Sequence, residues 1–95
     1  RYNAFANTKL NEILKSLNVE KVIICGFMTN FCCESTTRSA HDYDYFVDFI
    51  LDATGTPGTE NINENKMREI IGELVDGYFA KVYTTKKYLA KITKG

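Results

Sequence analysis

The chain has 95 residues, 44% of them hydrophobic, and its 12 basic and 12 acidic side chains cancel to a formal net charge of zero. This balance argues against a surface for nucleic acid or for anionic membranes, because such surfaces need an excess of basic residues. No apolar run approaches the roughly 20 residues of a membrane span. We therefore expect one small globular domain that does not associate with a membrane.

The three cysteines, Cys25, Cys32 and Cys33, form neither an even set nor a Cys-x-x-Cys pair. This spacing does not indicate a disulfide framework, so we expect free thiols in a reducing compartment, the cytoplasm. Cys25 and Cys33 are expected to be small buried hydrophobic residues.

The first predicted elements are a helix and a strand, which follow an irregular segment over residues 1–7. Asn7 or Thr8 can cap the helix, and its apolar residues recur at helical spacing as one stripe that would face a sheet: Leu10, Ile13, Leu14 and Leu17. The strand over about 21–25 is almost continuously apolar. It is therefore predicted to be buried on both faces, as strands of parallel sheets are.

Gly26 ends this strand, and a short polar turn over 28–31 leads into a helix predicted from Cys33 to about Tyr43. Small residues would let this helix lie close to the sheet, with a contact face formed by Thr36, Ala40 and Tyr43. His41, the sole histidine, lies in the middle of the helix. It is expected to be a surface or packing residue, because one histidine cannot form a metal site by itself.

The second half of the chain repeats the alternation of strand and helix. A strand over 46–51, apolar apart from Asp48, precedes a loop over 52–59 that is rich in Gly, Pro and Thr and is predicted to be irregular. A helix over about 63–76 with Gly77 at its C-terminal end carries one apolar stripe: Met67, Ile70, Ile71 and Leu74. A strand over 79–84 follows, and Lys81 favours an edge position for it. Residues 85–95 are predicted to form a short basic helix and a tail.

The order helix-strand-helix-strand-helix-strand predicts an α/β fold with parallel strands and right-handed crossovers. The strand over 21–25 would lie at an edge of this sheet, although its apolar character is typical of a central strand. We therefore expect another polypeptide segment to cover the edge at Lys21 to Cys25.

Cys32 lies at the junction between the first predicted strand and the helix that follows it. Open α/β sheets bind ligands at the carboxyl ends of their strands, and a helix N-terminus favours thiolate over thiol. The turn would thus combine a nucleophile with main-chain N–H groups that attract an anion. The loop over 52–59, at the end of the next strand, is expected beside it.

The segment GFMTNFC at 26–32, followed by ESTTRSA at 34–40, resembles the nucleophile motif of the isochorismatase-like cysteine hydrolases, which include nicotinamidases. RYNAFANT at 1–8 is similar to a second family signature, and DAT at 52–54 to a third. Three matches in the family's order cover nearly all of this chain, but only the C-terminal part of the family fold.

The resemblance implies that the Cys32 thiolate attacks the carbonyl carbon of a small amide, breaks its C–N bond and forms an acyl-enzyme. It implies an oxyanion hole from the backbone N–H groups of Met28 and Cys32, and a cis peptide between Phe27 and Met28. Residues near a bound substrate would be Tyr2, Phe5, Asn30 and Phe31. For Tyr2 and Phe5 the alternative is that they fill the core.

The resemblance also implies a three-layer αβα Rossmann-like fold, of which residues 1–95 are the C-terminal part of a single domain. The family's catalytic Asp and Lys, and the metal ligands of nicotinamidases, match no position here, so this chain alone is expected not to hydrolyse amides. The implied partners are the missing N-terminal half and, as is common in the family, further copies of the protein. No cofactor is indicated.

Three alternatives remain open. The chain could be a non-catalytic family member that serves as an interaction or scaffold subunit. The adjacent Cys32 and Cys33 could oxidise or bind a soft metal, although a disulfide between neighbouring cysteines is strained. An unrelated dinucleotide-binding domain is disfavoured, because such domains carry a Gly-x-Gly-x-x-Gly loop after a strand and this chain has only Gly26 of that pattern.

Overall fold

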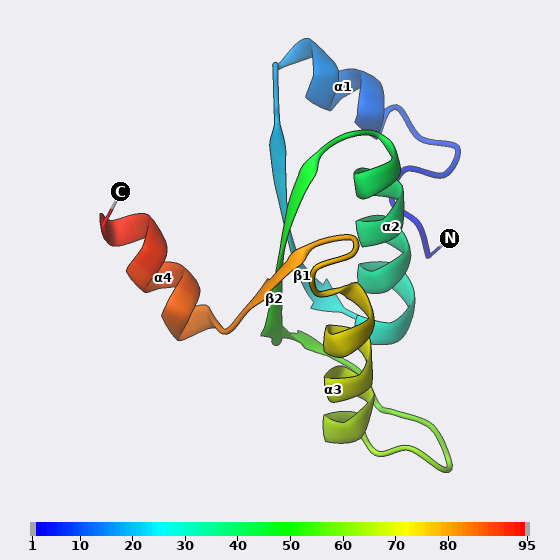
Figure 1. The fold of residues 1–95 in the computed structure, drawn as a ribbon. Helices are drawn as coiled ribbons and strands as arrows, with labels where there is room; N and C mark the ends of the chain where they lie inside the picture. The colour runs from blue at the N-terminus through cyan, green and yellow to red at the C-terminus, as the bar shows by residue number, and fades with distance from the viewer. Residues whose placement is uncertain (1, 95) are drawn as a thin grey trace.

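A computed structural model describes residues 2–94, which form a parallel sheet with helices on both faces (Figure 1). The sheet has three strands in the order β1-β2-β3, namely β1 (Lys21–Phe27), β2 (Phe46–Gly55) and β3 (Lys81–Tyr83). The helices are α1 (Leu10–Ser16), α2 (Glu34–Asp42), α3 (Glu64–Val75) and α4 (Thr85–Lys94). This confirms the predicted α/β fold with its parallel strands.

The two faces of the sheet carry different helices. Helices α2 and α3 lie together on one face, and α4 lies on the other (Figure 1). The alternation of side chains along β2 sets this arrangement: Phe49 points into the core under α2 and α3, whereas Asp48 accepts a hydrogen bond from Tyr88 of α4. None of the helices described has the length and hydrophobicity of a membrane span.

The core lies between the sheet and the layer of α2 and α3. One cluster of buried side chains surrounds Phe49 and joins the start of α2 to α3: Cys33, Met67, Ile71 and Val75. A second cluster lies nearer the amino ends of the strands: Phe5, Ala40, Tyr45 and Val47. Ile24 and Ala80 pack against both clusters and so connect them.

Strand β1 packs against the core on one face only, and even there its residues are half-buried, so the prediction of burial on both faces is wrong for this chain. Val22 and Ile24 pack toward the core, whereas Ile23 is 54% exposed and Cys25 and Phe27 are also exposed. The reason is position, because β1 is an edge strand and no helix in the part of the chain described covers this side of it. The predicted edge position is confirmed.

Helix α1 is shorter and more exposed than the apolar stripe predicted. Leu10 and Leu14 pack against the second cluster, but Ile13 and Leu17 are exposed, so the expected stripe of sheet-facing residues is only half correct. Thr8 Oγ1 accepts a hydrogen bond from the Leu10 N–H at 3.3 Å, close to the predicted start. The helix lies at the periphery of the molecule, beyond the amino end of β1 (Figure 1).

Two further predictions needed correction along α2 and β2. On α2 the buried residues are Thr37 and Ala40, whereas Thr36 is half-buried and Tyr43 is exposed. Strand β2 continues through residues predicted to be an irregular loop, because Thr54 and Gly55 pair with Gly26 and Phe27 of β1 beyond a shift in register. Pairing with a neighbouring strand thus overrides the weak local preference of these residues.

The ends of α3 follow the signals in the sequence. The Asn63 side chain accepts a hydrogen bond from the Lys66 N–H at 2.8 Å and caps the N-terminus. Gly77, just after the helix, has a φ of +79°, which suits glycine. Met67 and Ile71 are buried as predicted, but Leu74 is exposed. Strand β3 is an edge strand, as Lys81 predicted.

Replacing Phe49 with alanine should lower the free energy of unfolding by about 3–5 kcal/mol, the range for removing a large side chain from a core. Phe49 is fully buried, whereas Phe46, three residues earlier on the same strand, is 71% exposed. The matched Phe46→Ala variant should therefore change stability by less than about 0.5 kcal/mol. Urea denaturation measures both, and equal losses would show that the core is not where we describe it.

The Gly58→Ala variant should be less stable than Gly77→Ala, although the two glycines have similar φ values of +75° and +79°. A left-handed conformation costs about 1–2 kcal/mol for any other residue. A Cβ at Gly58 would also lie 2.4 Å from the Ile62 carbonyl oxygen, whereas nothing lies within 4 Å of one at Gly77. The clash should add about 1–3 kcal/mol. Thermal and urea unfolding measure the stability of both variants, and a lower stability of Gly77→Ala would contradict this expectation.

Candidate active site

The chain passes from β1 to α2 through a tight π-helical turn, η1 (Thr29–Cys33), that holds Cys32. The Met28 carbonyl oxygen accepts hydrogen bonds from the N–H groups of Phe31 at 3.3 Å and Cys33 at 3.0 Å. The peptide bond between Phe27 and Met28, just before the turn, is cis. Of the residues predicted as a short polar turn, Met28 is extended, whereas Thr29 to Phe31 are helical and continue through Cys33 into α2.

Adjacent cysteines on this turn have different surroundings. Cys33 is buried against Phe49 and the residues of α3, whereas Cys32 is half-buried. Burial, reinforced by the neighbouring Cys32 and Cys25, raises the pKa of Cys33 to about 11. Cys33 is thus a core residue, as predicted, and remains a neutral thiol near pH 7. Cys25 is exposed, so the prediction that it is buried is wrong.

Hydrogen bonds tie the end of β2 to the turn. The Thr29 hydroxyl donates to Thr54 Oγ1 at 2.8 Å, and the Thr54 hydroxyl donates to the Leu51 carbonyl at 2.7 Å. The Thr56 hydroxyl donates to the Asn30 side-chain oxygen at 2.7 Å. The predicted location of the segment after β2 beside the Cys32 turn is confirmed.

The roles of Thr54 and Thr56 were not found from the sequence. Both threonines are buried, and each binds a residue of the turn that carries Cys32. Their location was predictable, since the carboxyl ends of neighbouring parallel strands meet at one edge of the sheet. Their hydrogen bonds were not, because threonine in a loop is common.

The N-terminal segment lies along α2 and brings an aromatic side chain to the turn. The Ala4 N–H donates to Thr36 Oγ1 at 3.0 Å, and Asn3 hydrogen-bonds Ser39. Tyr2 then stacks on Phe31, with 4.9 Å between the ring centroids, and both rings are exposed. Tyr2, Phe31 and Asn30 thus lie on or against the turn.

Phe5 lies away from the exposed pair of Tyr2 and Phe31. It is buried among Ala40, Tyr45 and Val47 in the second core cluster, where its ring stacks with that of Tyr45. Of the two roles considered for Phe5, filling the core is the one its surroundings fit.

Metal-ligating side chains do not gather in the part of the chain described, since it holds no group of three His, Cys, Asp or Glu residues suited to a metal ion. His41 is exposed and packs edge-to-face on Phe79 with 5.5 Å between ring centroids, as expected for a packing residue. The reactive group available at the turn is therefore the half-exposed thiol of Cys32, two residues along the turn from Asn30.

Comparisons with known proteins agree with this geometry. Over 55 residues, 58% of this chain and 28% of the other, it is 47% identical to nicotinamidase 3 of Arabidopsis thaliana. Over 92 residues, 97% of this chain and 40% of the other, it is 29% identical to ureidoacrylate amidohydrolase RutB of Azorhizobium caulinodans. The crystal structure of a cysteine hydrolase from Pseudomonas syringae pv. phaseolicola superposes with a TM-score of 0.82 at 28% identity, covering 98% of this chain and 46% of that one.

The chain spans less than half the length of each of these proteins. The sequence model of the isochorismatase domain matches residues 1–87, which is nearly the whole chain. The chain therefore belongs to the isochorismatase family.

Proposed function

We propose that this chain is the C-terminal part of a cysteine hydrolase domain that cleaves the C–N bond of a small amide, with Cys32 as the nucleophile. The observation that carries the proposal is the position of Cys32, a half-buried thiol on the turn between β1 and α2. The amidohydrolase names of two relatives and the cysteine hydrolase name of a similar structure support the reaction class.

In the proposed reaction the Cys32 thiolate attacks the amide carbon, and the carbonyl π electrons move onto oxygen. Main-chain N–H groups of Met28 and Cys32 would hold this oxyanion, which is the usual way to stabilise such a charge. Collapse of the intermediate expels the amine once its nitrogen has gained a proton, and leaves a thioester on Cys32. Water then attacks the thioester, releases the carboxylic acid and returns the thiol. The proton transfers need an acid or base that the family resemblance places outside this chain.

The aromatic pair of Tyr2 and Phe31 would form one wall of the substrate site. The rings are stacked and exposed, and Phe31 directly precedes Cys32. Asn30, held by the Thr56 hydroxyl, would present its amide on the other side of the turn. The family resemblance and the position beside Cys32 support these roles.

The exposed face of β1 supports a further part of the proposal, that another polypeptide segment completes the sheet. Ile23, Cys25 and Phe27 line one side of an edge strand, where their side chains lack a covering layer in the residues described. An exposed, apolar edge strand is a ready site for strand addition. The occupant proposed is the N-terminal half of the same domain, which would bring the missing catalytic groups.

Alkylation should distinguish the three thiols. With a pKa of about 11, Cys33 holds only about one thiolate per thousand molecules at pH 8 and should stay unmodified by iodoacetamide. Cys32 should react faster than Cys25, although Cys25 is the more exposed. Peptide mass spectrometry against time measures the rates, and the urea-denatured chain is the control. Three equal, slow rates in the native protein would contradict a catalytic Cys32.

Amide hydrolysis should require both Cys32 and the N-terminal half of the domain. We expect no turnover of nicotinamide or simple amides by the 95-residue chain alone. We expect turnover when the N-terminal half of a domain of the same family is added to it. Cys32→Ala should abolish that activity, whereas Cys25→Ala, which removes an exposed thiol of β1 and leaves Cys32 in place, should retain it. Ammonia release measures the rates. Turnover by the chain alone, or by the Cys32→Ala variant, would contradict the assignment.

A further inference from the structure

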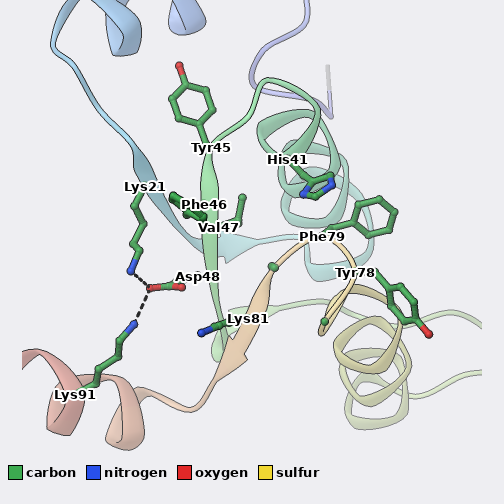
Figure 2. A pocket seen from close by; sticks show the side chains of 12 residues that line it. Lys21, His41, Tyr45, Phe46, Val47, Asp48, Tyr78, Phe79, Lys81 and Lys91 are labelled. Carbon is green, nitrogen blue, oxygen red and sulfur yellow. Dashed lines mark hydrogen bonds and ion pairs between the residues drawn. The ribbon is translucent and has the colours of Figure 1, made fainter.

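A cavity of about 500 Å³ lies at the end of the sheet where the three strands begin (Figure 2). Its lining includes the first residue of every strand, namely Lys21 of β1, Phe46 of β2 and Lys81 of β3. The strands are parallel, so their amino ends meet here, whereas Cys32 follows the carboxyl end of β1. The volume is within the range of pockets that hold small molecules.

Positive charge exceeds negative charge in this cavity. Lys21 and Lys91 both reach a single oxygen of Asp48, with Nζ–Oδ2 distances of 3.4 and 3.5 Å (Figure 2). The same oxygen accepts a hydrogen bond from the Tyr88 hydroxyl at 2.9 Å. Lys81 also lines the cavity, and Asp48 is the sole carboxylate among its lining residues. Three ammonium groups against one carboxylate leave a net charge of +2 within the lining.

The protonation states of these groups keep the excess charge in place. A hydrogen bond to the Tyr83 hydroxyl raises the pKa of Lys91, so its ammonium stays charged at neutral pH. Burial and the bond to Asp48 raise the pKa of Tyr88, so its hydroxyl keeps its proton and goes on donating. One oxygen of Asp48, Oδ2, is shared by that donor and the two ammonium groups.

The same cavity offers a flat apolar surface beside the cations. Lys21 and Phe46 are partners in the register of β1 and β2, so their side chains lie on the same face of the sheet. The Phe46 ring is 71% exposed, although Asp48, two residues further along the same face, is almost fully buried. A large exposed aromatic ring beside three ammonium groups that share one carboxylate fits a ligand that combines a planar ring with an anionic group.

We propose that this cavity binds a small planar aromatic anion, with its charged group on Lys21 and Lys91 and its ring on Phe46. The shared chemistry is a ring that carries a carboxylate or a phosphate. The site lies at the other end of the sheet from Cys32 and does not depend on amide hydrolysis, so either proposal can fail without the other.

Titrations with defined probes test the site. Benzoate and adenosine monophosphate represent an aromatic carboxylate and an aromatic phosphate, benzamide is the neutral match of benzoate, and inorganic phosphate is an anion without a ring. We expect saturable shifts of the Phe46 and Lys21 NMR signals with benzoate or with adenosine monophosphate, and which of the two binds identifies the anion. Benzamide and inorganic phosphate should bind at least about tenfold more weakly, because each lacks one of the two contacts.

Variants distinguish binding at this cavity from nonspecific attraction of anions to positive charge elsewhere on the surface. Lys21→Gln and Lys91→Gln should each weaken binding by about tenfold, and Lys21→Arg should restore most of it, since a charged group contributes about that factor. Lys66→Gln, which removes a lysine on the exposed face of α3, is the matched control and should change nothing. No saturable shift with either aromatic anion would overturn the proposal. So would benzamide binding as tightly as benzoate, or unchanged affinity in the two glutamine variants.

Discussion

The contact between Cys33 and Phe49 fixes the geometry on which the candidate active site depends. Cys33 is the last residue of the π-helical turn and belongs to the core cluster that joins β2 to α3. Because neighbouring residues on a helical turn point in different directions, burying Cys33 leaves Cys32 at the margin of the core. The thiol proposed as the nucleophile is therefore held in place by the buried thiol next to it. A residue at position 33 that did not fit under Phe49 would move Cys32 with it.

Polar contacts between β2 and the turn complete this framework. Thr29 and Thr54 form a buried hydroxyl pair, and Thr56 holds Asn30. Buried hydroxyl groups are costly unless they are paired, so these bonds favour one arrangement of the two strand ends over others. The packing of Cys33 sets the depth of the turn, and these hydrogen bonds set its lateral position against β2.

The sequence was sufficient for the order of the elements, the parallel strands, both edge positions and the placement of Cys32 at a turn. These follow from apolar runs, helical periodicity and chain connectivity, which are properties of local sequence. Burial was harder to predict. Ile23 and Cys25 have the composition of a central strand, but their exposure depends on what lies across the edge of β1, which no local pattern records. The extension of β2 to Gly55 likewise depends on pairing with β1. Asp48, seen in the sequence only as an interruption of an apolar strand, proved to be the centre of a charged cluster.

The unequal burial of the two sides of β1 bears on how the protein behaves in solution. An apolar edge strand with free main-chain groups is a template on which other strands add, and proteins usually blunt such edges with charge, proline or a covering element. Of the residues from Val22 to Phe27, none is charged and none is proline. A segment that covered this edge, as we propose, would therefore protect the protein against aggregation as well as complete the fold. Without such a segment, the strand that leads to Cys32 would be the site at which chains associate edge to edge.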